Sequence, residues 1–160
     1  IAAANGPAAG AGFSLALACD LRIAAKGAFF APAYGRIGAS PDGGMTYFLP
    51  RVLGPAKALE LLLEDPNLKA EAALQMGLVT EVVADDELVT RTRERAEKLA
   101  KLAPHYVKMA KRLVGESLEN DIAKHLQLER HGIADSMATE DLRQGVPAFF
   151  SGEKPTFTGK

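Results

Sequence analysis

The segment GASPDGGMTYFLPRVLG, residues 38–54, contains one carboxylate, Asp42, between a proline and two glycines. An acid directly before an apolar helical pattern often caps the helix by accepting backbone N–H bonds. A carboxylate can also take and return a proton, which is the work of a general acid and base. The residues of this segment leave both roles open for Asp42.

A second candidate is the turn Gly10-Ala11-Gly12, which opens an apolar helical pattern. Small residues there suit a tight strand-to-helix turn. A dinucleotide-binding loop is disfavoured, because Leu15 stands where that motif has its third glycine and no acid follows at the expected distance. The remaining reactive residue types give weaker signals. Ser14 has no evident His and acid partners, and structural roles are expected for the single cysteine, Cys19, and for the three histidines.

Composition bounds the function of the chain. The 160 residues are 48% hydrophobic and 24% charged with a net charge of −1, values typical of a globular domain with a compact core. This charge balance argues against a nucleic-acid-binding surface. The longest apolar run is broken by Asp20 and Arg22, well short of the roughly 20 residues that a bilayer requires. We therefore expect no nucleic-acid partner, no membrane span and a cytoplasmic location.

The pattern of residues divides the chain into an α/β region, 1–84, and a helical region, 85–160. The first half alternates short apolar runs with Gly-rich turns, which indicates layered strands and helices. The second half has amphipathic periods, with Asp85 and Asp86 expected to cap a long helix. The expected strands are 1–4, 22–25, 29–33 and 78–83, and the expected helices are 10–20, 43–54, 55–65, 69–77, 87–103, 104–114 and 118–137. Because residues 1–4 resemble a strand that needs neighbours at its edges, we expect the chain to be part of a longer protein.

Several motifs occur in one consistent order along the chain. They are NGPAAGAGFSLALACDLRIAA, FFAPAYGRIGASPDGGMTYFLPRVLG, AKALELLL and AEAALQMGLVTEVV. In this order they resemble the enoyl-CoA hydratase/isomerase, or crotonase, family over nearly the whole chain, without the family's N-terminal third. The resemblance implies an α/β crotonase-like spiral of ββα units followed by a helical trimerisation region.

The resemblance also implies a chemistry. Members of this family bind an acyl-CoA thioester and stabilise an enolate, whose negative oxygen is held by backbone N–H groups. Ala11 would supply one of the two donors, and Gly10 and Gly12 would let the substrate approach the backbone. The other donor would lie upstream of Ile1.

Hydratases of this family use two glutamates, and the matching positions here hold Ser14 and Tyr34. Asp42 matches the aspartate of the family's double-bond isomerases. The resemblance favours the branch that isomerises phenylacetyl-CoA epoxide in phenylacetate degradation, with Asp42 as acid and base in an apolar pocket near Phe30, Tyr34 and Met45. Pro41 and Gly43, beside Asp42, are expected to contact the substrate together with Phe30 and Tyr34.

Two alternatives remain open. In the family's dehalogenase branch, and in related hydrolases, the aspartate at this position attacks the substrate as a nucleophile. The chain could also belong to a non-catalytic member of the family that only binds acyl-CoA.

The resemblance further implies a homotrimer or a dimer of trimers, in which the C-terminal tail reaches the CoA of a neighbouring subunit. Phe157 and Lys160 would contact its adenine and phosphate, although a frayed terminus is an equal alternative. No metal and no redox cofactor is expected, and coenzyme A enters only as part of the substrate.

Overall fold

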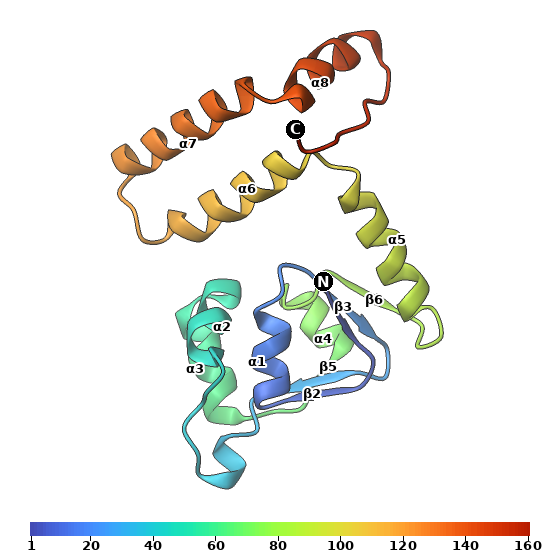
Figure 1. Ribbon diagram of the computed structural model, residues 1–160. Helices are drawn as coiled ribbons and strands as arrows, with labels where there is room; N and C mark the ends of the chain where they lie inside the picture. Colours follow the sequence, from blue (N-terminus) through green and yellow to red (C-terminus); the bar gives the residue numbers. More distant parts are fainter. The chain divides into compact units, whose positions relative to one another are not determined.

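The computed structural model describes residues 1–160 and divides into two compact units (Figure 1). Residues 1–95 form an α/β unit, and residues 96–160 form a helical unit. Helix α5, Leu88–Ala100, runs across the boundary between them.

The α/β unit contains two small sheets of three strands each. In the first sheet β3 lies between β1 and β6 and is parallel to both, and in the second β4 lies between β2, which is parallel, and β5, which is antiparallel. The short turn between β1 and β2 carries the chain from one sheet to the other. The strands are β1 (Ala2–Ala4), β2 (Pro7–Ala9), β3 (Arg22–Ala25), β4 (Phe29–Ala31), β5 (Leu68–Lys69) and β6 (Glu81–Val83).

The helices of this unit pack around one apolar core. Phe13 from α1 and Phe30 from β4 lie with ring centroids 5.5 Å apart, and Met45 and Leu49 from α2 are fully buried beside them. The apolar composition of α1 predicted a helix that is buried on nearly every side. This prediction is wrong, since Leu15 is 70% exposed. The helices are α1 (Ala11–Leu17), α2 (Met45–Leu53), α3 (Pro55–Glu64) and α4 (Ala70–Gln75), with one 3-10 turn at Gly35–Ile37.

Local signals located most of these elements, but not those whose partners are distant in the chain. The strand at 22–25 and the helix that begins at Pro55 are found as predicted. Strands β2 and β5 were missed, because they are two or three residues long and are defined by pairing with β4.

Asp85 accepts a hydrogen bond from Gly27 N–H at 3.0 Å, so its carboxylate stabilises the turn between β3 and β4.

The helical unit consists of α6 (Pro104–Ser117), α7 (Ile122–Met137) and α8 (Glu140–Ser151). Helices α6 and α7 lie side by side in an antiparallel pair (Figure 1). The single helix expected over 118–137 begins later, at Ile122, because Asp121 caps it by accepting a bond from Lys124 N–H at 2.9 Å. Helix α8 was not predicted. Thr139 caps it, and Pro147 lies inside it.

The C-terminal tail is held to α8 by its backbone. The carboxylate of Asp141, which is 2% exposed, accepts hydrogen bonds from Thr158 N–H at 2.7 Å and Gly159 N–H at 2.9 Å. The Lys160 carbonyl in turn accepts a bond from Glu140 N–H at 2.7 Å. The alternative of a frayed terminus is therefore wrong for the backbone of these residues.

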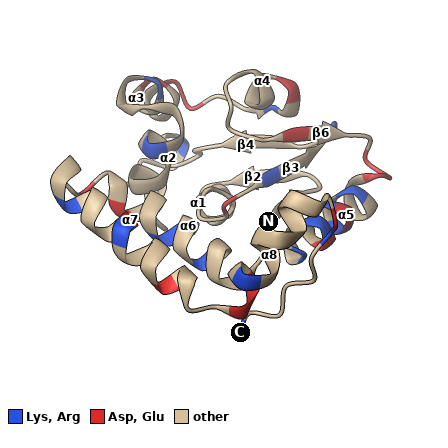
Figure 2. Cartoon of the chain, turned by 90° about the horizontal axis from the view of Figure 1, so that it is seen from above, with Lys and Arg blue, Asp and Glu red and all other residues tan.

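Charges of both signs lie along α5, whereas α1, β2 and β4 carry none (Figure 2). No helix has the length and hydropathy needed to cross a membrane. These uncharged elements meet at the start of α1. The few polar groups there are therefore surrounded by elements without charged residues.

Replacing Asp141 with alanine is expected to release the tail. The variant should lose the slow hydrogen exchange of the Thr158 and Gly159 amides, and about 1–3 kcal/mol of unfolding free energy, because both hydrogen bonds to a buried carboxylate are lost. Asp135→Ala, at an exposed position of α7, serves as the control and should change neither quantity. Unchanged protection of the tail amides in Asp141→Ala would contradict the assignment.

Candidate functional site

Three polar side chains from separate parts of the α/β unit meet near the start of α1. The Tyr34 hydroxyl donates to Asp42 Oδ1 at 2.7 Å, and the Ser14 hydroxyl donates to the Asp42 carbonyl at 3.0 Å. Ser14 Oγ and Tyr34 Oη are 3.4 Å apart. Ser14 is fully buried and Tyr34 nearly so, whereas Asp42 is exposed. The Tyr34 hydroxyl thus holds the exposed carboxylate of Asp42, and the Ser14 hydroxyl holds the backbone carbonyl of the same residue.

The contacts of Asp42 test its predicted role as a helix cap. Helix α2 begins after Gly44, and no side chain caps it. The backbone carbonyl of Asp42 accepts the Met45 N–H at 3.0 Å, but its carboxylate is turned to the Tyr34 hydroxyl. The capping role is therefore wrong, and the role of acid and base stays a prediction.

Gly43 is required by the close approach of two segments. Its φ of +59° lies in the left-handed region, and a Cβ added there would lie 3.0 Å from Ser14 Cβ. A side chain at this position would meet both backbone strain and a steric clash. Glycine at 43 therefore allows the Asp42 carbonyl to reach the Ser14 hydroxyl.

The start of α1 presents unpaired backbone N–H groups. The first bond of the helix runs from Ser14 N–H to the Gly10 carbonyl, which leaves the Ala11 N–H without an acceptor inside the helix. Gly10 has a φ of +53°, so glycine is needed there for backbone geometry. Gly12 is exposed, and a Cβ at this position would meet nothing within 4 Å. Because α1 is only seven residues long, individual N–H groups matter here more than a helix dipole.

The expected apolar pocket around Asp42 is not formed by the residues named for it. Phe30 and Met45 are both 0% exposed in the core, where they contact other core side chains and not a surface. The assignment of Phe30 as a substrate contact is therefore wrong in this structure. Tyr34 contacts the Asp42 carboxylate through its hydroxyl, whereas Met45 contacts only the Asp42 carbonyl, through its backbone N–H. Pro41, half-buried, precedes Asp42 directly.

Asp65, which the sequence analysis did not identify as a site residue, is hydrogen-bonded to the loop that carries Tyr34. Its carboxylate accepts hydrogen bonds from Ala33 N–H at 2.6 Å and from Arg36 N–H at 3.3 Å. The only local signal was the pair Asp65-Pro66 at the end of a helix, which is a common helix stop. The link to Ala33 depends on tertiary structure alone.

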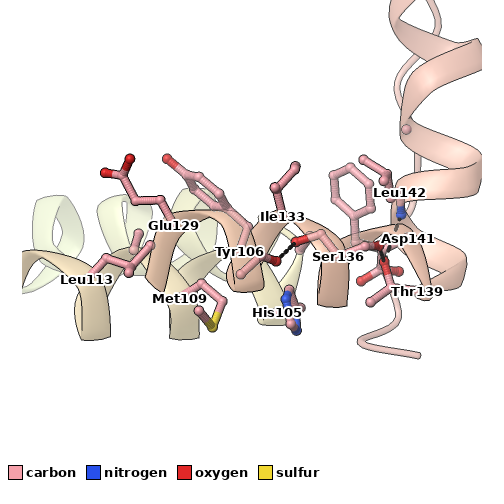
Figure 3. Close-up of a pocket in the computed structure, with 15 residues that line it drawn as sticks. His105, Tyr106, Met109, Leu113, Glu129, Ile133, Ser136, Thr139, Asp141 and Leu142 are labelled. Carbon is pink, nitrogen blue, oxygen red and sulfur yellow. Dashed lines mark hydrogen bonds between the residues drawn. The ribbon is translucent and has the colours of Figure 1, made fainter. Parts of the chain in front are cut away.

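Phe157 and Lys160 belong to the helical unit. Phe157 lines a cavity of about 380 Å³ among α6, α7 and α8, and its ring lies 3.3 Å from where a Gly145 Cβ would be. In the view of Figure 3 the lining side chains Tyr106, Ile133 and Glu129 lie above the helix ribbons, and His105 and Met109 lie below them. The cavity has apolar walls and lies in a different unit from Asp42. The contacts of Phe157 and Lys160 with a cofactor remain predictions.

The histidines, Arg22 and Cys19 take no part in the hydrogen bonds of Asp42. All three histidines lie in the helical unit, on α6 and α7. Arg22 is buried and donates to the Leu78 carbonyl at 2.6 Å and to the Cys19 carbonyl at 2.5 Å. Burial lowers the pKa of this guanidinium below its ordinary value, since the charged form is desolvated. Cys19 is only half-buried and lies beyond the end of α1, which corrects its expected place inside a helix.

Comparison with known proteins identifies the family. The profile of the family described as enoyl-CoA hydratase/isomerase matches residues 1–160. The chain belongs to the enoyl-CoA hydratase/isomerase family. It is 40% identical to a probable enoyl-CoA hydratase of Rhodobacter capsulatus and 39% identical to the 1,2-epoxyphenylacetyl-CoA isomerase of Escherichia coli, over all 160 residues in both cases. It spans 62% and 61% of the length of these relatives.

Solved structures of the family share the fold. A crystal structure of an enoyl-CoA hydratase/isomerase from Cupriavidus metallidurans superposes with a TM-score of 0.90 at 39% identity, covering 96% of this chain and 58% of that one. An enoyl-CoA hydratase from Bacillus anthracis gives a TM-score of 0.91 at 34% identity, covering 97% of this chain and 60% of that one. The crotonase-like α/β fold expected for this family member is confirmed.

Gly43→Ala is expected to destabilise the α/β unit by about 1–3 kcal/mol, because alanine is strained at positive φ and its Cβ would clash with Ser14. The matched variant Gly12→Ala places its methyl group in open space at a helical position. It should be neutral or stabilising, by up to about 1 kcal/mol. Urea unfolding of both variants, followed by circular dichroism, measures the difference. Equal stability of the two would show that the close approach at Gly43 is not required.

Proposed function

We propose that this family member acts on an acyl-CoA thioester as an enoyl-CoA isomerase, with Asp42 as the acid and base. The observation that carries the proposal is the orientation of Asp42, whose carboxylate accepts the Tyr34 hydroxyl and leaves α2 uncapped. In the proposed reaction Asp42 takes a proton from the carbon beside the thioester. The electrons of that C–H bond form the enolate, and the same carboxyl group returns the proton further along the conjugated system.

The backbone at the start of α1 supplies one part of the proposed oxyanion hole. The Ala11 N–H has no intrahelical acceptor, and the exposed Gly12 beside it leaves the approach open. An N–H group fixed in a helix needs no reorganisation when negative charge forms on the thioester oxygen. A second donor from another segment completes the hole.

The relatives carry hydratase and isomerase names alike, so the choice between the two rests on this chain's own residues. Hydration by the two-glutamate route needs carboxylates where this chain has Ser14 and Tyr34. Ser14 is fully buried, and its hydroxyl is committed to the carbonyls of Gly10 and Asp42. Neither Ser14 nor Tyr34 can act as the missing carboxylate, which favours a single acid and base.

The E. coli relative named 1,2-epoxyphenylacetyl-CoA isomerase supports a finer proposal, that the substrate resembles phenylacetyl-CoA epoxide. The assembly proposed is a homotrimer or a dimer of trimers, in which Phe157 and Lys160 contact the CoA of a neighbour. The exposed Phe149, Phe150 and Ile133 of the helical unit supply apolar surface for such an assembly. The reaction proposed uses no metal and no redox cofactor.

Asp42→Asn in the complete protein is expected to reduce proton exchange by a factor of about 10²–10⁴, because an amide cannot act as the base. The measurement is deuterium incorporation beside the thioester when enoyl-CoA isomers, including the epoxyphenylacetyl thioester, are incubated in deuterated water. Asp86→Asn, at another exposed acid of the α/β unit, is the control and should retain the exchange.

The same assay separates the other chemistries of the family. Halide release from a chlorobenzoyl-CoA would indicate the dehalogenase, and water addition to crotonyl-CoA that survives Asp42→Asn would indicate a hydratase. Binding of thioesters without exchange or turnover would indicate a non-catalytic family member. Any of these three results would overturn the isomerase proposal.

Ala11→Pro tests the oxyanion donor with little expected change in fold, since proline is accepted at the first position of a helix and removes only its N–H. The rate constant for turnover should fall by a factor of about 10²–10³, the usual effect of losing one such donor. Ala11→Gly keeps the N–H and should remain active. Equilibrium binding of the thioester distinguishes lost stabilisation from a blocked site, and full turnover by Ala11→Pro would exclude Ala11 as a donor.

A further inference from the structure

The loop that carries Tyr34 is hydrogen-bonded to the residue at the C-terminal end of α3. The carboxylate of Asp65, the residue that ends α3, accepts from Ala33 N–H at 2.6 Å and from Arg36 N–H at 3.3 Å. Its side chain is 10% exposed, and the bond from Ala33 is partly buried, whereas the bond from Arg36 is exposed. Within the loop, the Tyr34 carbonyl accepts the amides of Ile37 and Ala39, which forms a local turn. Asp65 thus joins this turn to a helix.

The backbone on both sides of this contact adopts a conformation that side chains rarely permit. Ala33 has a φ of +64° and Asp65 a φ of +45°, and both residues carry a Cβ. Such residues persist where the surrounding structure holds them, and they cluster at functional sites. The hydrogen bond from Ala33 N–H to the Asp65 carboxylate links the two residues directly.

The side chain of Arg36 adds further contacts between the Tyr34 loop and the end of α3. Its Nη2 donates to the Asp65 carbonyl at 2.7 Å and to Asn67 Oδ1 at 2.7 Å, and its Nε lies 3.5 Å from Asp65 Oδ2. Hydrogen bonds to an ionised carboxylate are shorter and stronger than those between neutral groups. An amide in place of the carboxylate keeps one acceptor oxygen but presents N–H groups to the other donor, so the two bonds from Ala33 and Arg36 together require both oxygens of a carboxylate.

We infer that Asp65 is a positioning residue for the proposed acid and base. The carboxylate fixes Ala33, which fixes the next residue, Tyr34, whose hydroxyl orients the Asp42 carboxylate at 2.7 Å. Asp65 itself touches neither Asp42 nor the proposed substrate position. The inference rests on the proposed function for its effect on catalysis, but its effect on Tyr34 can be measured without turnover.

The kinetic test compares Asp65→Asn with Asp85→Asn in the complete protein. Asp85 also accepts a backbone N–H, from Gly27 in the same unit, and has no contact with the Tyr34 loop, so it is a matched control. Asp65→Asn should lower kcat for proton exchange about tenfold with little change in KM, because the base is misplaced while binding remains. In a Tyr34→Phe background, which already lacks the hydroxyl, Asp65→Asn should cause no further loss.

A second measurement does not depend on activity. Tyr34 is one of three tyrosines in these 160 residues, and 3-fluorotyrosine labelling gives a fluorine NMR signal for each of them, which single Tyr→Phe variants assign. Asp65→Asn should move or broaden the Tyr34 signal and leave those of Tyr47 and Tyr106 in place, and Asp85→Asn should move none. If the wild-type protein exchanges no proton, the proposed function fails while this spectrum still decides the role of Asp65.

Two results would overturn the inference. The first is an unmoved Tyr34 signal in Asp65→Asn. The second is a loss of kcat that is as large in the Tyr34→Phe background as in the wild type, because Asp65 would then act through general stability and not through Tyr34.

Discussion

The hydrogen bond between the Tyr34 hydroxyl and Asp42 Oδ1, 2.7 Å long, joins a nearly buried ring to an exposed carboxylate. A buried hydroxyl needs a partner, and a surface carboxylate without one would be free to rotate or to cap the nearest helix. The contact gives the buried Tyr34 hydroxyl its partner, and it keeps the Asp42 carboxylate from rotating freely or capping a helix. The proposed acid and base therefore has one oxygen fixed by the protein and the other available to a substrate.

This contact depends on backbone geometry in three places. Gly43 allows the segment at Asp42 to approach Ser14, and Gly10 turns the chain from β2 into α1. Asp65 holds Ala33 in a left-handed conformation directly before Tyr34. Each position uses a conformation that most residues avoid, and each lies within one or two residues of a group in the proposed site. The polar cluster is thus stabilised by backbone constraints as well as by its own hydrogen bonds.

Family membership narrows the chemistry without settling the reaction. The matched relatives include proteins named as hydratases and as an isomerase, at nearly equal identity. The backbone N–H groups at the start of α1 suit both activities, because both proceed through a negative oxygen. The isomerase proposal rests on one carboxylate, that of Asp42, which accepts the Tyr34 hydroxyl, while the Ser14 hydroxyl donates to the Asp42 carbonyl.

The sequence by itself determined the elements that rest on local physics and the residue types of the site. The strand at 22–25, the helix beginning at Pro55 and the turn at Gly10 follow from apolar periods and from Pro and Gly preferences. Asp42 and Ala11 were assigned to the site because their motifs occur in a recognisable order, and these assignments stay predictions. Tertiary structure decided the rest, since β2 and β5 exist only through pairing with β4, and Phe30 faces the core instead of a substrate. Tertiary structure also decided the direction of the Asp42 carboxylate and the hydrogen bond between Asp65 and Ala33. Both contacts join segments that are brought together by packing, and no local sequence pattern indicates this packing.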